Sequence, residues 1–254
     1  MLKLSKAFAF ILAFFLIVPT VNAKNTSHSW YCKRNNKHEQ PVLDSNFKFY
    51  EKYDLYWIDK ANNNKKIYLT FDAGYENGNI SKILDVLKEE NVPGAFFVLG
   101  NLVKKNTDLI KRMLDEGHLV CNHTYNHKDM TRLNIEEFEL ELRSLSELLE
   151  EKTGCQIAKY YRPPEGKFNE DNLKWAQELG YKTIMWSFAY ADWDNQKQPN
   201  YDYAKKKILD NVHNGEVMLL HPTSKTNASI LKEVITILKE QGYEFGTLDE
   251  LCGS

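Results

Sequence analysis

Two histidines lie four residues apart in the run His123-Thr124-Tyr125-Asn126-His127. The run follows directly on the apolar stretch that ends at Cys121. Imidazoles at this spacing converge on one cation if the segment makes a helical turn. A pair of this kind also arises often by chance, so taken alone it indicates metal binding only weakly. Other residues of the chain must supply the rest of such a site.

Asp72 and Arg162 could form a base and the group that orients it. Asp72 ends the apolar run Ile67-Tyr68-Leu69-Thr70-Phe71. Burial raises the pKa of a carboxyl group, so only a nearby metal ion or arginine would keep Asp72 ionised. Arg162 can be that cation, because Pro163 and Pro164 stiffen the loop that carries it. The ordinary alternatives are that Asp72 caps the next helix and that Arg162 belongs to a rigid surface turn.

His221 and Asp192 could supply a proton to a leaving group. His221 follows the apolar run 217–220, and histidine, with an ordinary pKa of about 6.5, holds a proton when a carboxylate such as Asp192 raises that pKa. Trp193 follows Asp192 directly, and Tyr190 lies two residues before it, so both rings could line a wall that binds a sugar. A buried core histidine and core aromatic residues are the common alternatives.

Short β-rich runs alternate with amphipathic helical stretches from Lys66 to the end of the chain. We predict strands at 66–71, 94–98, 119–121, near 160–161, 182–187, 216–220 and 243–245, and helices at 81–90, 102–116, 135–151, 170–179, 203–212 and 229–241. About seven such units without a linker indicate one α/β domain, either a barrel of parallel strands or an open doubly wound sheet. We favour the barrel, because its chemistry collects after the strands, where the polar residues named above fall.

Composition excludes several classes of protein. The 254 residues include 33 basic and 35 acidic residues, which leave a formal charge of −2 and no general attraction to nucleic acid or anionic lipid. A mean hydropathy of −0.53 excludes a multi-span membrane protein. The run Asp72-Ala73-Gly74-Tyr75 after the first predicted strand has no glycine-rich phosphate loop, so nucleotide chemistry has no support.

The first 23 residues differ from all that follow. Lys3 and Lys6 precede twelve apolar residues at 7–18, and the small-residue pattern Val21-Asn22-Ala23 follows, which indicates a secretory signal peptide cleaved after Ala23. The apolar run would span about 18 Å, short of the roughly 30 Å hydrocarbon core, so we expect no stable membrane anchor after cleavage.

Four cysteines without a CxxC pair argue against a thiolate zinc site and leave disulfide pairing open: Cys32, Cys121, Cys155 and Cys252.

These motifs, in their order along the chain, resemble those of the polysaccharide deacetylases of the NodB-homology type, carbohydrate esterase family 4. The resemblance covers about residues 66–251. It rests on five ordered motifs, namely Thr70-Phe71-Asp72-Ala73-Gly74, His123-Thr124-Tyr125-Asn126-His127, Arg162-Pro163-Pro164-Glu165-Gly166, Asp192-Trp193 and Leu219-Leu220-His221. The runs Tyr75-Glu76-Asn77-Gly78 and Gly242-Tyr243-Glu244-Phe245 are similar to the sporulation branch, which makes muramic δ-lactam in spore cortex.

The resemblance implies a distorted (β/α) barrel that removes the N-acetyl group from N-acetylmuramic acid in peptidoglycan. The implied roles are Asp72 as general base, His123 and His127 as ligands of a divalent metal ion (zinc, manganese or magnesium), Arg162 as the group that orients Asp72, His221 as general acid, and Asp192 as its partner. Residues 66–254 would form the deacetylase domain, and residues 24–65 an N-terminal extension packed on the barrel. We expect an exported monomer that meets peptidoglycan strands in the cell wall or spore cortex, with no nucleic acid partner.

Two positions depart from the family pattern. Ala73 stands where most of the family has a second aspartate that binds the metal ion, and where the sporulation branch often has asparagine. We expect water, substrate or Glu76 to fill that ligand position. Glu165 stands where arginine or an aromatic residue is common, so its carboxylate would lower the affinity for acidic glycans. Together with Tyr190 and Trp193, Glu165 is a predicted substrate-binding residue.

Other functions remain open. The enzyme could act on chitin oligomers, N-acetylglucosamine residues or xylan esters. Ala73 could also mark a catalytically inactive module that only binds glycans. A module that only binds has no chemical reason to keep a base, its orienting arginine and an acid together, so the retained Asp72, Arg162 and His221 favour an enzyme.

Overall fold

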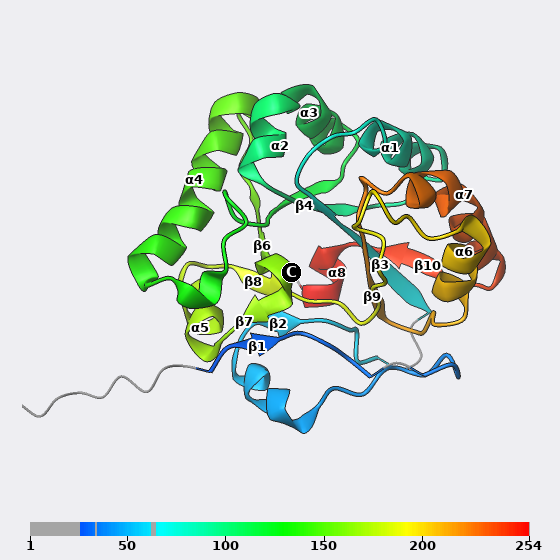
Figure 1. Ribbon diagram of the computed structural model, residues 1–254, viewed down its shortest axis with the longest axis horizontal. Coiled ribbons are helices and arrows are strands. Elements are labelled where there is room, and N and C mark those ends of the chain that lie inside the picture. The colour runs from blue at the N-terminus through cyan, green and yellow to red at the C-terminus, as the bar shows by residue number, and fades with distance from the viewer. Residues whose placement is uncertain (1–25, 34, 62–64, 254) are drawn as a thin grey trace, which may run out of the picture.

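The computed structural model describes residues 26–33, 35–61 and 65–253 (Figure 1). The predicted signal peptide, residues 1–23, lies outside this range. No helix of the described part is both long and apolar enough to cross a membrane.

A parallel sheet curls into an incomplete barrel at the centre of the molecule (Figure 1). Its strands run in the order β10-β3-β4-β5-β6-β8-β2, and β9 pairs with β3. Their bounds are β2 Leu55–Tyr56, β3 Lys66–Ala73, β4 Ala95–Val98, β5 Leu119–Asn122, β6 Ala158–Tyr161, β8 Lys182–Ile184, β9 Glu216–Leu220 and β10 Glu244–Gly246. The chain after β8 meets β9, because Phe188 bridges Met218 in parallel. The predicted barrel of parallel strands is therefore confirmed over the open doubly wound sheet.

Helices surround the outside of this sheet (Figure 1). Their bounds are α1 Ile80–Glu89, α2 Gly100–Lys105, α3 Thr107–Asp115, α4 Ile135–Thr153, α5 Glu170–Glu178, α6 Tyr201–Leu209, α7 Lys225–Glu240 and α8 Leu248–Cys252. The short 3-10 helices are η1 Ser45–Lys52, η2 Met130–Arg132 and η3 Pro164–Gly166.

The alternation of side chains along β3 separates core from site. Ile67, Leu69 and Phe71 pack with the apolar faces of α1 and α7, whereas Tyr68 joins an inner cluster of the barrel. Because successive side chains of a strand point to opposite faces, Asp72 follows Tyr68 toward the interior and Ala73 follows Phe71 toward the helices. The same strand thus contributes to the hydrophobic core and presents one carboxylate at the mouth of the barrel.

Two predicted elements differ from those observed. The single helix predicted at 102–116 is divided into α2 and α3, because Asn106 leaves the helical conformation and its carbonyl oxygen accepts from Leu109 and Ile110 of α3. The strand predicted at 182–187 already ends at Ile184, since the chain then crosses toward β9, where Ser187 N donates to Val217 O. The sequence analysis did not predict α8 or the short elements before residue 66.

The segment 26–61 joins the sheet and also packs on it. β1 (His28–Ser29) pairs antiparallel with β7 (Lys167–Phe168), and β2 extends the sheet beside β8. An aromatic cluster fills the space between this segment and the barrel: Trp30, Phe47, Tyr50, Trp57 and Phe168. All four cysteines lie in the described part of the chain, and none of them forms a disulfide bond.

Candidate active site

A cleft of about 940 Å³ opens at the carboxyl ends of the parallel strands. Asp72 comes from β3, His123 and His127 follow β5, and His221 follows β9. All four side chains line this cleft. The groups that the sequence predicted to meet therefore face one cavity.

Arg162 holds the carboxylate of Asp72 in place. The guanidinium is fully buried, and its Nη1 donates to Asp72 Oδ1 at 2.8 Å. Its other nitrogens donate to Thr70 Oγ1 at 3.0 Å and to the carbonyl oxygen of Ile184 at 3.0 Å. Burial by itself would raise the pKa of Asp72, but the positive charge of the adjacent Arg162 guanidinium outweighs it and holds that pKa below its ordinary value. Asp72 is ionised and oriented.

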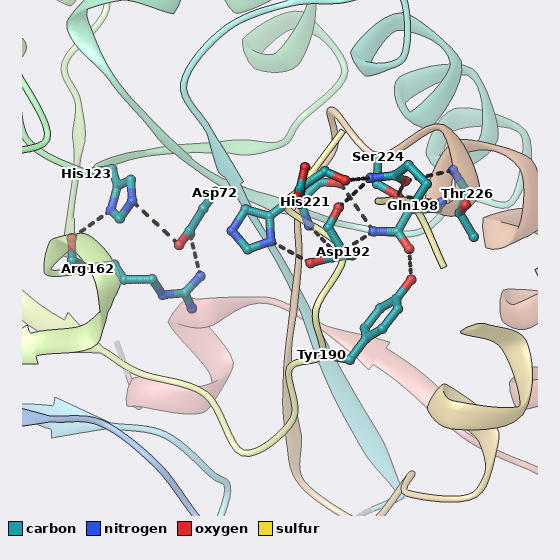
Figure 2. A network of polar contacts seen from close by, with 11 residues as sticks. Asp72, His123, Arg162, Tyr190, Asp192, Gln198, His221, Ser224 and Thr226 are labelled. Atoms are coloured by element: carbon teal, nitrogen blue, oxygen red, sulfur yellow. Dashed lines mark hydrogen bonds and ion pairs between the residues drawn. The ribbon is translucent and has the colours of Figure 1, made fainter. Parts of the chain in front are cut away.

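His123 presents a free nitrogen lone pair to the cleft. The carbonyl oxygen of Arg162 lies 2.8 Å from Nδ1 and can only accept, so Nδ1 carries the proton (Figure 2). Nε2 is then unprotonated and lies 3.6 Å from Asp72 Oδ2. Burial lowers the pKa of His123 to about 4, although Asp72 acts in the opposite direction. A neutral imidazole with its other nitrogen bound to a carbonyl group is the form that binds metal ions.

The loop from His123 to His127 does not make the helical turn on which the sequence analysis based their convergence. Thr124 and His127 adopt the left-handed conformation, with φ of 72° and 58°. The hydroxyl of Thr124 accepts from His127 N at 2.9 Å, which closes the loop. The two imidazole rings lie 5.1 Å apart between centroids. The two rings therefore lie close together, and a loop with two left-handed residues, not a helical turn, brings them there.

Glu141 of α4 anchors the same loop, and sequence reasoning missed it. Its carboxylate accepts from Asn126 N at 2.8 Å and from Asn126 Nδ2 at 2.9 Å, and Lys128 lies 2.9 Å away. Glu141 is buried although it is acidic. A charged residue on the same helical stripe as Phe138 and Leu142 was the available signal.

His221 and Asp192 form a buried acid–base pair. Asp192 is fully buried, and its Oδ1 lies 2.7 Å from His221 Nδ1, while its Oδ2 accepts from His221 N at 2.8 Å. Burial lowers the pKa of His221, but the hydrogen bond and the charge of Asp192 outweigh it, so the pKa is raised. Figure 2 shows the ring of His221 between Asp72 and Asp192. The ring can therefore hold a proton on Nε2.

The three predicted substrate-binding residues also line the cleft. Trp193 is 62% exposed, and Glu165 forms an ion pair with Lys167 at 2.6 Å. The hydroxyl of Tyr190 donates to the buried amide of Asn227, so this residue offers the cleft its ring. That Trp193, Glu165 and Tyr190 contact substrate stays a prediction.

Glu76 does not replace the carboxylate ligand that is missing at Ala73. Its carboxylate accepts from Ile80 N at 3.2 Å and from Gly78 N, so it caps α1 instead. Ala73 is fully buried in the cluster that faces the helices. In the described part of the chain, no three His, Cys, Asp or Glu side chains gather as metal ligands. His123 and His127 nevertheless fit a divalent ion that water or substrate oxygen also coordinates, because borderline ions accept imidazole nitrogen.

The comparisons with known proteins agree with this geometry. The model of the polysaccharide deacetylase family matches residues 59–184. The chain is 42% identical over 228 residues to the peptidoglycan-N-acetylmuramic acid deacetylase PdaA of Bacillus subtilis, which covers 89% of this chain and 86% of that protein. The chain belongs to the polysaccharide deacetylase family. The predicted family, carbohydrate esterase family 4, and the predicted class of hydrolase, a deacetylase that acts on carbon–nitrogen bonds, are confirmed.

Solved structures of this deacetylase family share the fold. That of Bacillus subtilis PdaA matches with a TM-score of 0.86 at 42% identity, covering 89% of this chain and 96% of that chain. A family 4 carbohydrate esterase from Bacillus anthracis matches with a TM-score of 0.75 at 39% identity, over 89% and 96% of the two chains. A pseudoenzyme of the same family from Bacillus anthracis matches with a TM-score of 0.70 at 32% identity, over 75% and 66%.

Proposed function

We propose that this protein is a metal-dependent deacetylase that removes the N-acetyl group from N-acetylmuramic acid in peptidoglycan. The observation that carries the proposal is that one cleft holds an ionised aspartate, two neighbouring imidazoles of the type that metal ions accept and a histidine whose pKa is raised. The similarity to PdaA supports N-acetylmuramic acid as the substrate. The similarity to PdaA also supports peptidoglycan as the partner that the protein binds.

The arrangement matches the demands of amide hydrolysis. An amide needs an activated water, stabilisation of negative charge on the carbonyl oxygen, and a proton for the departing nitrogen. A divalent ion held by His123 and His127 would polarise the carbonyl group and make the water more acidic. Asp72 takes the proton of that water, because it is ionised and faces the cleft. His221 gives the proton on Nε2 to the nitrogen of the amine that leaves.

Arg162 and Asp192 act through these two groups. Both side chains are fully buried and do not line the cleft. Arg162 keeps Asp72 ionised and aimed, and Asp192 keeps His221 protonated and aimed. They are positioning residues, whereas Asp72 and His221 are the catalytic residues.

The place of the reaction follows from the substrate. We infer that residues 1–23 direct export, that the mature protein works as a monomer outside the cytoplasm, and that residues 66–254 carry the catalysis. The freed amine lies next to the lactyl carboxylate of muramic acid, so the product can close to the δ-lactam of spore cortex once the peptide has been trimmed.

Metal analysis of the purified protein identifies whether it binds zinc, manganese or magnesium.

Mass spectrometry of muropeptides tests the substrate. Purified protein is incubated with peptidoglycan that lacks stem peptides, and the digest is compared with that of Asp72→Asn. We expect replacement of one acetyl group by hydrogen on muramic acid, and none with the variant. Loss of acetyl from N-acetylglucosamine alone would contradict the proposed substrate.

A glycan-binding module without turnover is the second candidate. The buried Ala73 and the absence of a third ligand in the described residues favour it, and the similarity to a pseudoenzyme of the family adds to this. In the same experiment this candidate predicts that the protein is retained on peptidoglycan while every acetyl group remains.

A further inference from the structure

Asn227 lies in the first turn of α7 and is buried with 1% of its surface exposed. Its Nδ2 donates to Asp192 Oδ2 at 2.6 Å and to the carbonyl oxygen of His221 at 3.2 Å. One side chain therefore contacts both members of the acid pair. The family motifs described above do not include this residue.

The orientation of the Asn227 amide is determined by its neighbours. A carboxylate and a carbonyl oxygen only accept hydrogen bonds, so the NH2 group must face Asp192 and His221. Oδ1 then faces Tyr190, whose hydroxyl must donate to it. Tyr190 lines the cleft, and Figure 2 shows the hydroxyl end of its ring pointing toward this network. A continuous chain of hydrogen bonds thus joins a wall of the cleft to the acid pair.

The carboxylate of Asp192 depends on few donors. Oδ1 accepts from His221 Nδ1, and Oδ2 accepts from His221 N and from Asn227 Nδ2. A fully buried carboxylate stays ionised only when hydrogen bonds and opposite charge offset its lost hydration. Asn227 is the donor in this set that does not belong to His221.

We propose that Asn227 is a positioning residue of the deacetylation, which holds the carboxylate of Asp192 aimed at His221 and links both to Tyr190. The inference rests on the proposed function in that it takes His221 as the general acid. Without the Asn227 donor, the carboxylate of Asp192 can turn away from Nδ1 of His221, which weakens the hydrogen bond between them. His221 then loses its proton at a lower pH.

The other groups that face His221 come from three separate elements. Asp192 lies in the loop after β8, Asp72 lies on β3, and Arg162 follows β6. Lys225, the charged residue in the first turn of α7, is exposed to solvent. A substitution of Asn227 leaves these charges in place, so a change in the titration of His221 reports on the hydrogen bond to Asp192.

Titration of His221 by NMR in the metal-free protein tests the proposal. Asn227→Leu removes the donor but keeps the branched skeleton of the side chain. A weaker hydrogen bond between Asp192 and the protonated ring should move the midpoint of His221 down by about one pH unit, a tenfold change in its protonation equilibrium. The alkaline limb of kcat should move by the same amount, with KM nearly unchanged. His221→Gln identifies the resonance.

Ser224→Ala is the matched control. The hydroxyl of Ser224 caps α7 by accepting from Asn227 N at 3.1 Å and does not touch Asp192. It should lower stability while leaving the His221 midpoint in place. Tyr190→Phe keeps the ring and removes the hydroxyl that orients the amide, so it should give a smaller shift of the same sign even if Asn227→Leu fails to fold.

Two results would overturn the role of Asn227. The first is a folded Asn227→Leu protein, or a Tyr190→Phe protein if that variant does not fold, with the wild-type His221 midpoint. The second is an equal shift in Ser224→Ala, which would reduce Asn227 to a structural part of α7. The NMR titration needs no turnover, so an inactive wild-type protein would contradict the proposed function and leave this test intact.

Discussion

At the scale of single residues, the site depends on opposing effects on one carboxylate. Burial disfavours the charge of Asp72, and the buried guanidinium of Arg162 restores it. The result is a base that is ionised over the whole neutral range. A buried pair of this kind leaves a costly unpaired charge when one partner is removed.

Asp72→Asn should lower kcat by about 10² to 10⁴, because an amide cannot take a proton from water. The amide oxygen can still accept from Arg162 Nη1, so we expect the variant to fold. Steady-state kinetics and circular dichroism check both statements. A kcat close to that of the wild type would show that Asp72 is not the base.

Glu165→Gln should favour acidic glycans. The Glu165 side chain is 60% exposed at the rim of the cleft and is partly neutralised by Lys167. Since exposed charges interact weakly, we expect a drop in KM of about twofold for muramic acid oligomers. Neutral chitin oligomers serve as the control, and an equal change with both substrates would mean that charge is not the cause.

At the scale of elements, the pair of histidines proposed to bind the metal ion depends on a loop of unusual conformation. The sequence predicted the residues, but not the two left-handed positions or the anchor on α4. Left-handed backbone at residues other than glycine costs of order 1 kcal/mol or more, so tertiary contacts must hold it.

His127→Gly should abolish metal binding with little effect on stability. Glycine adopts the φ of 58° without strain, which offsets its greater freedom in the unfolded chain, so the free energy of unfolding should change by no more than about 1 kcal/mol. Urea unfolding and calorimetric titration with zinc measure the two effects. Retained zinc affinity would mean that His127 is not a ligand.

Glu141→Ala should weaken metal binding by about tenfold, as removal of outer supports of a metal site commonly does. The variant frees Asn126 and with it the loop between the two ligands. Glu147→Ala is the control, because Glu147 is exposed on the same helix and pairs with Arg143. Equal affinity in both variants would contradict the anchoring role.

Much of the site could be predicted because runs of apolar residues in the sequence mark where the buried strands end. Asp72 and His221 each follow a run of apolar residues, and parallel strands deliver such residues to one edge. Their direct partners Arg162 and Asp192 were predicted as well. The further supports Glu141 and Asn227 could not be predicted. Glu141 lies 15 residues after Asn126, and Asn227 lies 35 residues after Asp192, and their roles depend on tertiary packing rather than on any local pattern.

At the scale of the whole molecule, the site affects stability. The pKa of His123 is about 4 in the folded protein, against an ordinary value of about 6.5. Below about pH 6.5 the unfolded chain therefore binds a proton that the folded protein refuses, so stability falls as the pH drops toward about 4. His221, with its raised pKa, contributes stability that is fully present below about pH 6.5 and lost as the pH rises through that raised value.

The metal-free protein should thus lose stability between pH 6.5 and pH 4, while Asp72, with a lowered pKa, contributes to acid loss only below its ordinary range. Urea unfolding at pH 7 and pH 5 measures the loss, and His123→Asn should reduce it, because asparagine does not titrate. An identical loss in the wild type and the variant would contradict the buried neutral state of His123.

The central claim is that Asp72, His123, His127 and His221 act together on an acetamide group with the help of a divalent ion. Release of acetate from N-acetylated peptidoglycan by the wild-type protein, measured before and after chelation and again after a divalent ion is restored, tests it most directly. The account predicts that release stops in chelator and returns with the ion. Undiminished release in chelator, or none with any divalent ion, would contradict it.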